Sequence, residues 1–130
     1  MGELYGRSID EALRRSGSAA QVAAVEASVR SDGPDAGTRR LRVIAGDLDI
    51  ELLPDRGLDL GQVRHRGVPL AWVSPTGWPR PGAAGFGASF GGGLVTTCGL
   101  LSFGPPSVDA EGEHPQHGRF SGLSASVTRA

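Results

Sequence analysis

The sequence contains neither lysine nor asparagine, and both absences exclude functions. All 13 basic residues are arginine, which rules out a Schiff-base mechanism, a lysine nucleophile and the lysine of a P-loop nucleotide site. Without asparagine, the chain offers no acceptor for N-linked glycosylation. A single cysteine cannot form an internal disulfide, which fits a reducing compartment.

Strong net charge and long apolar runs are also missing. The net charge is -1 and 21% of the residues are charged, so no strong field attracts the chain to nucleic acid or to a membrane. No apolar run approaches the roughly 20 residues that cross a bilayer, and the polar start of the chain is unlike a signal peptide. We therefore expect a cytoplasmic protein with neither a nucleic-acid nor a membrane partner.

Glycine, by contrast, is abundant, with 21 among 130 residues and no collagen period. Frequent glycines and few helical stretches favour a turn-rich β protein. The clearest helix signal lies near the start, where Ser8 and Glu11 form a capping-box pattern. It predicts a short helix over Ile9–Arg15, with two arginines placed favourably at its C-terminal end. The length is that of a single domain.

Alternating apolar and polar residues predict antiparallel strands. Two such runs, Leu41–Ala45 and Leu48–Leu52, flank Gly46-Asp47 in the pattern of a β-hairpin. The segment Gln21–Arg30 fits helical and strand spacing equally well. Further strands are predicted at Leu58–Leu60, Val68–Trp72, Leu94–Cys98 and Leu100–Phe103, with another beginning at Ser121 and running to Arg129. The expected fold is all-β with one short N-terminal helix.

Four short motifs follow one another along the chain. They are RGLDLG (Arg56–Gly61), GVPLAWVSPTG (Gly67–Gly77), GGLVTTCGL (Gly92–Leu100) and HGR (His117–Arg119). In this order they resemble the DUF4432 family of aldose-1-epimerase-like proteins, which belongs to the wider galactose-mutarotase-like group. The resemblance implies a sugar-binding β-sandwich, and it favours a strand at Gln21–Arg30.

The resemblance also bears on domain organisation. Members of that family are longer, so residues 1–130 correspond to a single domain that is the N-terminal, truncated portion of a mutarotase-like sandwich. An incomplete sandwich leaves strand edges and an apolar face open. We therefore expect marginal stability or self-association through open sheet edges.

The resemblance implies a sugar site around HGR. A histidine followed by glycine contacts the sugar in the mutarotase-like group, which makes His117 the candidate catalytic residue. Arg119 offers a fork of donors to sugar hydroxyls, and the family pattern has an acidic residue at Asp109. In an extended segment His117 and Arg119 would face the same side, lining a shallow cleft beside Gly91–Cys98 with Asp109 close by. Arg56 is a further candidate for substrate binding, although a local ion pair with Asp55 is an equal alternative.

Competing interpretations of these segments are weaker. The set Asp109, Glu111, Glu113, His114 and His117 has metal-binding chemistry, but Pro115 opposes the helix that would align the histidines, so a solvated acidic loop is preferred. Gly85–Phe90 lacks the third glycine of a dinucleotide fingerprint and is expected to be a loop. We expect neither a metal nor a cofactor. In the apolar stretches, Cys98 and Trp72 are expected in the core and Trp78 at the surface.

Two functions of different class remain. The first is an aldose 1-epimerase-like isomerase of carbohydrate metabolism, in which a carboxylate takes the proton of the anomeric hydroxyl and His117 protonates the ring oxygen. The mutarotases' general base lies beyond the stretch to which this chain corresponds, so whether the chain is an enzyme by itself stays open. The second is a non-catalytic carbohydrate-binding protein or an inactive fragment. The expected partner in both is a small-molecule sugar.

Overall fold

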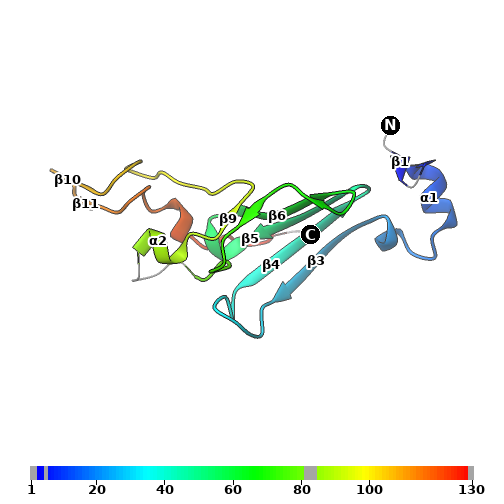
Figure 1. The fold of residues 1–130 in the computed structure, drawn as a ribbon, viewed down its shortest axis with the longest axis horizontal. Coiled ribbons are helices and arrows are strands. Elements are labelled where there is room, and N and C mark those ends of the chain that lie inside the picture. The colour runs from blue at the N-terminus through cyan, green and yellow to red at the C-terminus, as the bar shows by residue number, and fades with distance from the viewer. Residues whose placement is uncertain (1–2, 5, 81–84, 129–130) are drawn as a thin grey trace.

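The computed structural model describes residues 3–4, 6–80 and 85–128. Its centre is a five-stranded antiparallel sheet with the order β3-β4-β5-β6-β7, so each strand lies beside the next one in the chain (Figure 1). The strands are β3 (Ala23–Val29), β4 (Arg39–Ala45), β5 (Leu48–Leu53), β6 (Asp59–His65) and β7 (Val68–Pro69). The predicted all-β class with one short N-terminal helix is confirmed.

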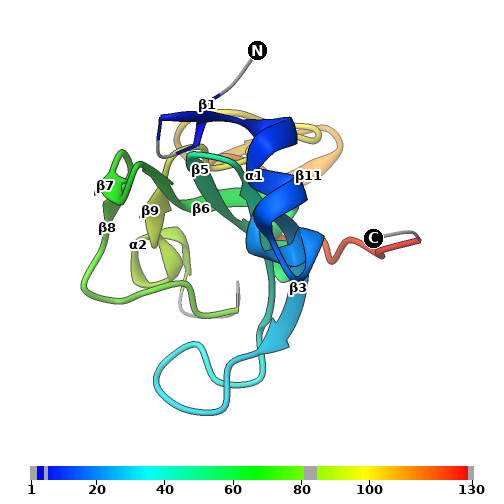
Figure 2. The same ribbon diagram turned by 90° about the vertical axis from the view of Figure 1, so that its right-hand side faces the viewer.

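The N-terminal segment forms a two-stranded hairpin followed by a helix. β1 (Glu3–Leu4) pairs with β2 (Arg7–Ser8), and α1 spans Ile9–Arg15 as predicted. The Ser8 hydroxyl accepts a hydrogen bond from the backbone N–H of Glu11 at 3.2 Å, which caps the first turn. A short 3-10 helix, η1 (Ala19–Gln21), then leads into the sheet. Figure 1 shows α1 at one end of the sheet, and the view along the long axis in Figure 2 places it in front of the strands.

The register of the sheet separates a polar from an apolar face. Directly paired residues share a face, and one row across the strands reads Val25, Val43, Ile50 and Val63. The neighbouring row reads Glu26, Arg42 and Glu51. The ambiguous segment is therefore a strand, and the β4–β5 hairpin turns at Gly46-Asp47 as its alternation predicts. Among the described residues the buried apolar core is small and comprises Val22, Leu53, Val63 and Trp78.

Beyond residue 70, the described residues form short regular elements only. β8 (Trp72–Val73) pairs with β9 (Gly92–Gly93), and β10 (Ser107–Asp109) pairs with β11 (Gly112–His114). A five-residue helix, α2 (Gly85–Ser89), replaces the predicted loop, and η3 (Phe120–Gly122) is a 3-10 turn. Within residues 3–4, 6–80 and 85–128, no helix has the length and apolar character needed to span a membrane.

Three predicted strands are wrong. Leu94–Cys98 makes one isolated bridge, Val95 to Leu60, and the other isolated bridge, Gly99 to Gly118, lies between this segment and Leu100–Phe103. In Leu100–Phe103 the reason is a positive φ at Leu100 (65°) and Leu101 (76°), which no continuous strand contains. The segment from Ser121 begins inside η3 and continues without strand pairing through the described residues, and Arg129 lies outside them.

The two tryptophans exchange their predicted environments. Trp72 is 63% exposed, whereas Trp78 is 8% exposed. The indole of Trp78 lies under the guanidinium of Arg40, 5.6 Å from the ring centroid, and its N–H donates to the carbonyl of Gly92 at 3.4 Å. Gly91 packs against the same indole so closely that a Cβ there would overlap it. The loop before Trp78 therefore folds back onto the sheet instead of extending into solvent.

Candidate functional site

The RGLDLG motif forms a buried ion pair that joins the sheet to the second half of the chain. Arg56 is 2% exposed and Asp59 is fully buried, and the Arg56 Nε donates to Asp59 Oδ2 at 3.3 Å. The other carboxylate oxygen of Asp59 accepts from the Thr97 hydroxyl at 2.7 Å and from the Thr97 N–H at 2.5 Å. Burial lowers the pKa of Arg56, and the charge of Asp59 opposes this effect.

Arg56 therefore does not form the ion pair with Asp55 that the sequence offered as an alternative to substrate binding. Its Nη1 donates to the carbonyl of Pro79 at 2.7 Å, so the guanidinium ties two loops together. Asp55 instead binds Arg39, with Nη2 to Oδ1 at 2.6 Å and the Arg39 N–H to Oδ2 at 2.8 Å. In this arrangement Arg56 is a buried positioning group and presents no donor to an approaching sugar.

A second buried pair, which the sequence reading missed, lies beside Trp78. Arg40 is 3% exposed, and its Nη2 contacts Asp35 Oδ2 at 2.6 Å while its Nε lies 3.3 Å from Glu51 Oε1. In the sequence, the signal for this pair is an arginine at a strand position with a carboxylate on the adjacent strand. Alternation alone does not distinguish such a buried arginine from a solvated one.

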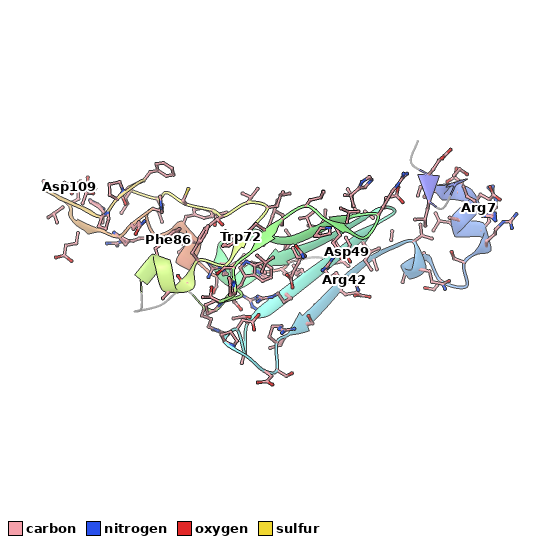
Figure 3. The ribbon with its side chains drawn as sticks, in the orientation of Figure 1. Arg7, Arg42, Asp49, Trp72, Phe86 and Asp109 are labelled. Carbon is pink, nitrogen blue, oxygen red and sulfur yellow. The ribbon has the colours of Figure 1, made fainter. Side chains whose placement is uncertain are left out.

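His117 lies in a row of aromatic side chains. Its imidazole centroid is 4.7 Å from the ring of Phe86 and 5.6 Å from that of Phe103. Phe86 contacts Phe90 at 5.1 Å, and Phe90 stacks on Trp72 at 6.3 Å. We call these five rings the aromatic strip. Figure 3 shows Phe86 and Trp72 near the end of the sheet that lies opposite Arg7.

The ends of the aromatic strip are open to solvent. Trp72 is 63% exposed and Phe103 is 74% exposed, while Phe86, Phe90 and His117 are half-buried. Aromatic rings usually bury most of their area, so a row of accessible faces is a site at which a partly apolar ligand can stack.

The HGR motif forms a turn that packs on Cys98–Leu100, the last three residues of the third motif. His117 has φ of 60°, and Gly118 has φ of 80°. The N–H of Gly99 donates to the carbonyl of His117 at 2.8 Å, and the N–H of Arg119 donates to the carbonyl of Gly99 at 2.9 Å. A Cβ at Gly118 would overlap the carbonyl oxygens of Gly99 and Ser102. The position therefore requires glycine both for its positive φ and for the lack of space for a side chain. The extended geometry expected for His117 and Arg119 is wrong because His117 is left-handed.

The structure separates the predicted site residues. Arg119 is exposed and donates from Nη2 to the carbonyl of Glu113 at 3.2 Å. Asp109 lies 2.9 Å from Nε2 of the buried His114, and the hydrogen bond to His114 lowers the pKa of Asp109. Asp109 is thus engaged with His114 and does not orient His117 or Arg119.

The remaining sequence expectations concern Cys98 and metal ions. Cys98 is exposed, so the expectation of a buried thiol is wrong. The strand that would have buried it does not form. In the part of the chain that the structure describes, no three His, Cys, Asp or Glu side chains gather as metal ligands would.

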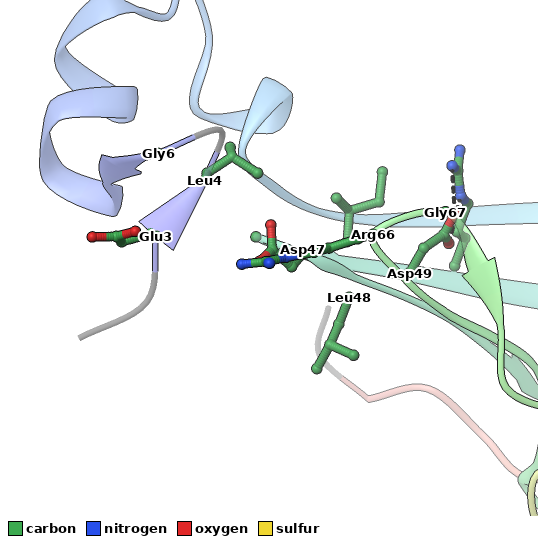
Figure 4. Close-up of a pocket in the computed structure, with 11 residues that line it drawn as sticks. Glu3, Leu4, Gly6, Asp47, Leu48, Asp49, Arg66 and Gly67 are labelled. Carbon is green, nitrogen blue, oxygen red and sulfur yellow. Dashed lines mark hydrogen bonds and ion pairs between the residues drawn. The ribbon is translucent and has the colours of Figure 1, made fainter.

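Two cavities lined by described residues lie away from the aromatic strip. One of about 620 Å³ lies between β1 and the hairpin tips of the sheet, lined partly by Glu3, Leu4 and Asp49 (Figure 4). Two ion pairs lie in its lining, Arg66 Nε with Asp47 Oδ2 at 2.8 Å and Arg42 Nη2 with Asp49 Oδ2 at 2.8 Å. A smaller cavity of about 330 Å³ is lined by Arg40, Glu51 and Trp78, among others. None of the predicted site residues lines either of these two cavities.

Comparison with known proteins identifies the family but no individual relative. The model of the family described as a domain of unknown function, DUF4432, matches residues 35–130, which include all four motifs and exclude α1. No curated protein and no solved structure matches the chain. Because the family model covers most of the sequence, the chain belongs to the DUF4432 family.

Proposed function

We propose that this protein binds a carbohydrate at the aromatic strip, as an aldose-1-epimerase-like protein acting on a sugar or sugar derivative. The observation that carries the proposal is the position of His117 between two phenylalanine rings in a row that ends in exposed Trp72 and Phe103. A pyranose has an apolar C–H face, which packs on the negative face of an aromatic ring, and hydroxyls at its rim. The strip supplies the apolar surface.

His117 within the strip, and Arg119 two residues further along the chain, can supply hydrogen bonds to a ligand. The imidazole of His117 can donate to or accept from a ring oxygen or hydroxyl near neutral pH. The guanidinium of Arg119 has five N–H donors, and among the described residues it donates through Nη2 to the carbonyl of Glu113, so further donors can meet a ligand. Each neutral hydrogen bond contributes about 0.5–1.5 kcal/mol, so the site is suited to weak, reversible binding.

The catalytic form of the proposal assigns His117 as the acid that protonates the ring oxygen. A carboxylate must then take the proton from the anomeric hydroxyl. Among the described residues, His117 makes no hydrogen bond or ion pair with a carboxylate, and Asp109 is held by His114. This observation favours the alternative, a carbohydrate-binding protein without turnover, for the chain on its own. We propose the cytoplasm as the compartment in which the protein acts.

A titration and a rotation measurement test both forms. Galactose or glucose is titrated while tryptophan fluorescence is recorded, because Trp72 is one end of the strip. Saturable quenching is expected in the natural chain, several-fold weaker binding in His117→Ala, and unchanged binding in the control Val108→Ala, which removes an exposed apolar side chain outside the strip.

Polarimetry on freshly dissolved sugar then separates the two forms. Accelerated mutarotation supports the epimerase, and saturable binding with an unchanged rate of rotation supports the binding protein. Absence of saturable binding for these and for phosphorylated or acidic sugars would overturn the proposal.

A further inference from the structure

The central sheet has one long edge without the usual protection. Among the described strands β3 pairs only with β4, and its outer side is open (Figure 1). Edge strands are normally short, interrupted by proline or bulges, or rich in charge. β7, at the other edge, fits this rule, with two residues that include Pro69. β3 does not, because its seven residues AAVEASV contain no proline and a single charge.

The free backbone groups of β3 can be assigned from its hydrogen bonds at both ends. The N–H of Arg30 donates to the carbonyl of Thr38 at 3.0 Å, and the N–H of Gly46 donates to the carbonyl of Val22 at 3.1 Å. Bonded positions alternate along an antiparallel pair, so the even-numbered residues of β3 face β4. The odd-numbered residues, from Ala23 to Val29, therefore direct their N–H and C=O groups outward.

We propose that β3 pairs antiparallel with β3 of a second copy of this chain, with Ala27 on the twofold axis. Ala27 then faces Ala27 of the second copy, and Val25 faces Val29 of the second copy in both directions. Each pair joins two outward-facing residues and exchanges both backbone hydrogen bonds. The interface is self-complementary, as a twofold dimer requires, and it joins two five-stranded sheets into one.

The side chains of β3 select this register. Val25 is 50% exposed and Val29 is 63% exposed, and the pairing places them against each other on the apolar face. On the other face Glu26 lies opposite Ser28 of the second copy, and its two diagonal neighbours there are Arg30 and Glu26, so Arg30 offsets the like charge. Moving the axis to Glu26 would oppose two glutamates, and moving it to Ser28 would separate the valine pairs. A shift of one residue would match outward groups with inward ones.

Sedimentation velocity over a concentration series tests the association. The natural chain should form a dimer that dissociates on dilution, and Ala27→Glu should abolish it, since it places like charges against each other on the axis. Val68→Glu is the matched control, because it charges a valine that is 60% exposed on the opposite edge, and its dimer should persist. Circular dichroism establishes that both variants keep their strands. A natural chain that is monomeric throughout, or an Ala27→Glu variant that still dimerises, would overturn the proposal.

Cysteine cross-linking tests the register, in a Cys98→Ser background because Cys98 is exposed. Paired residues in a hydrogen-bonded position have Cα atoms about 5.5 Å apart, within the span of about 4.4–6.8 Å that a disulfide bridges. Ala27→Cys should cross-link to itself. Val25→Cys and Val29→Cys should each fail alone and cross-link when mixed. Self-linking of Val25→Cys with no reaction of Ala27→Cys would contradict this register.

Discussion

The sheet of residues 23–69 and the loop-rich segment of residues 70–128 are held together in different ways. In the sheet, register and cross-strand rows distribute the stabilisation over many backbone hydrogen bonds. In the loop-rich segment, strands are two or three residues long and the chain is fixed by a few contacts. Those contacts include the Asp59–Thr97 bonds, the Arg56–Pro79 bond and the close packing of Gly91 and Gly118.

This difference predicts where single substitutions matter. A side chain on the polar face of the sheet is replaceable, because its neighbours and the backbone ladder remain. The buried carboxylate of Asp59, which lies in β6 and binds the loop-rich segment through Thr97, has no substitute, and neither has a crowded glycine within that segment. The same region carries the aromatic strip, so its geometry depends on few residues.

The largest effect is expected at Asp59. Asp59→Asn leaves the charge of Arg56 buried without its partner, which costs about 3–5 kcal/mol of the free energy of unfolding. Urea denaturation followed by tryptophan fluorescence measures the loss. A cost below about 1 kcal/mol would mean that water or another carboxylate stabilises the buried charge of Arg56. The sheet and the loop-rich segment would then be held together by other contacts.

The next effect is expected at Gly118. Gly118→Ala forces a left-handed residue, at about 1–2 kcal/mol, and adds an overlap with the carbonyls of Gly99 and Ser102. Gly122→Ala is the control, because open space surrounds that glycine and its φ is not positive. The urea midpoint should fall for Gly118→Ala and stay near the natural value for Gly122→Ala. Equal midpoints would show that the HGR turn is not held as described.

A pH effect is expected from Asp55. Its hydrogen bond with Arg39 lowers the pKa of Asp55, and burial opposes the shift. The pair therefore adds stability above the unfolded-state pKa of about 3.9, and this stability is lost as the pH falls through the lower folded-state value. Asp55→Asn should be less stable than the natural chain at pH 7, and the difference should shrink towards pH 2. A difference that is constant with pH would exclude this linkage.

The smallest effect is expected on the polar face. Arg42 and Asp49 pair at 2.8 Å, but the Arg42 side chain is 52% exposed. Exposed pairs contribute about 0–1 kcal/mol, so Asp49→Asn should change the free energy of unfolding by less than about 1 kcal/mol. Repeating the measurement at high salt should reduce even this difference, because salt screens surface charges. A cost as large as that of Asp59→Asn would remove the contrast between the exposed face of the sheet and the buried contacts that fix the loop-rich segment.

The two regions also differ in how far the sequence predicts them. The helix at Ile9–Arg15 and the hairpin from Leu41 to Leu52 depend on neighbours along the chain, so capping and alternation suffice. Leu100 and Leu101 have apolar side chains typical of strands, yet their positive φ values arise within a segment that bonds to the distant HGR turn. Local pattern contains no signal for such a contact.

The candidate site shows the same limit. The HGR motif identified His117 as a candidate, but its ring contacts come from Phe86 and Phe103. No rule of sequence spacing connects these phenylalanines with His117. The exchange of Trp72 and Trp78 has a similar cause, since burial of Trp78 depends on Arg40 and Gly91. Residue type indicated the chemistry, and long-range packing determined the geometry.

The most direct test of the account is an amide NMR titration of the natural chain with methyl galactoside or methyl glucoside. Sugar binding at the aromatic strip predicts saturable shift changes in residues 86–90, 98–104 and 117–119, with the amides of β3, β4 and β5 unchanged. Trp72→Ala should weaken the binding and keep the pattern. Shift changes confined to the sheet, or none at saturating sugar, would contradict the proposed site.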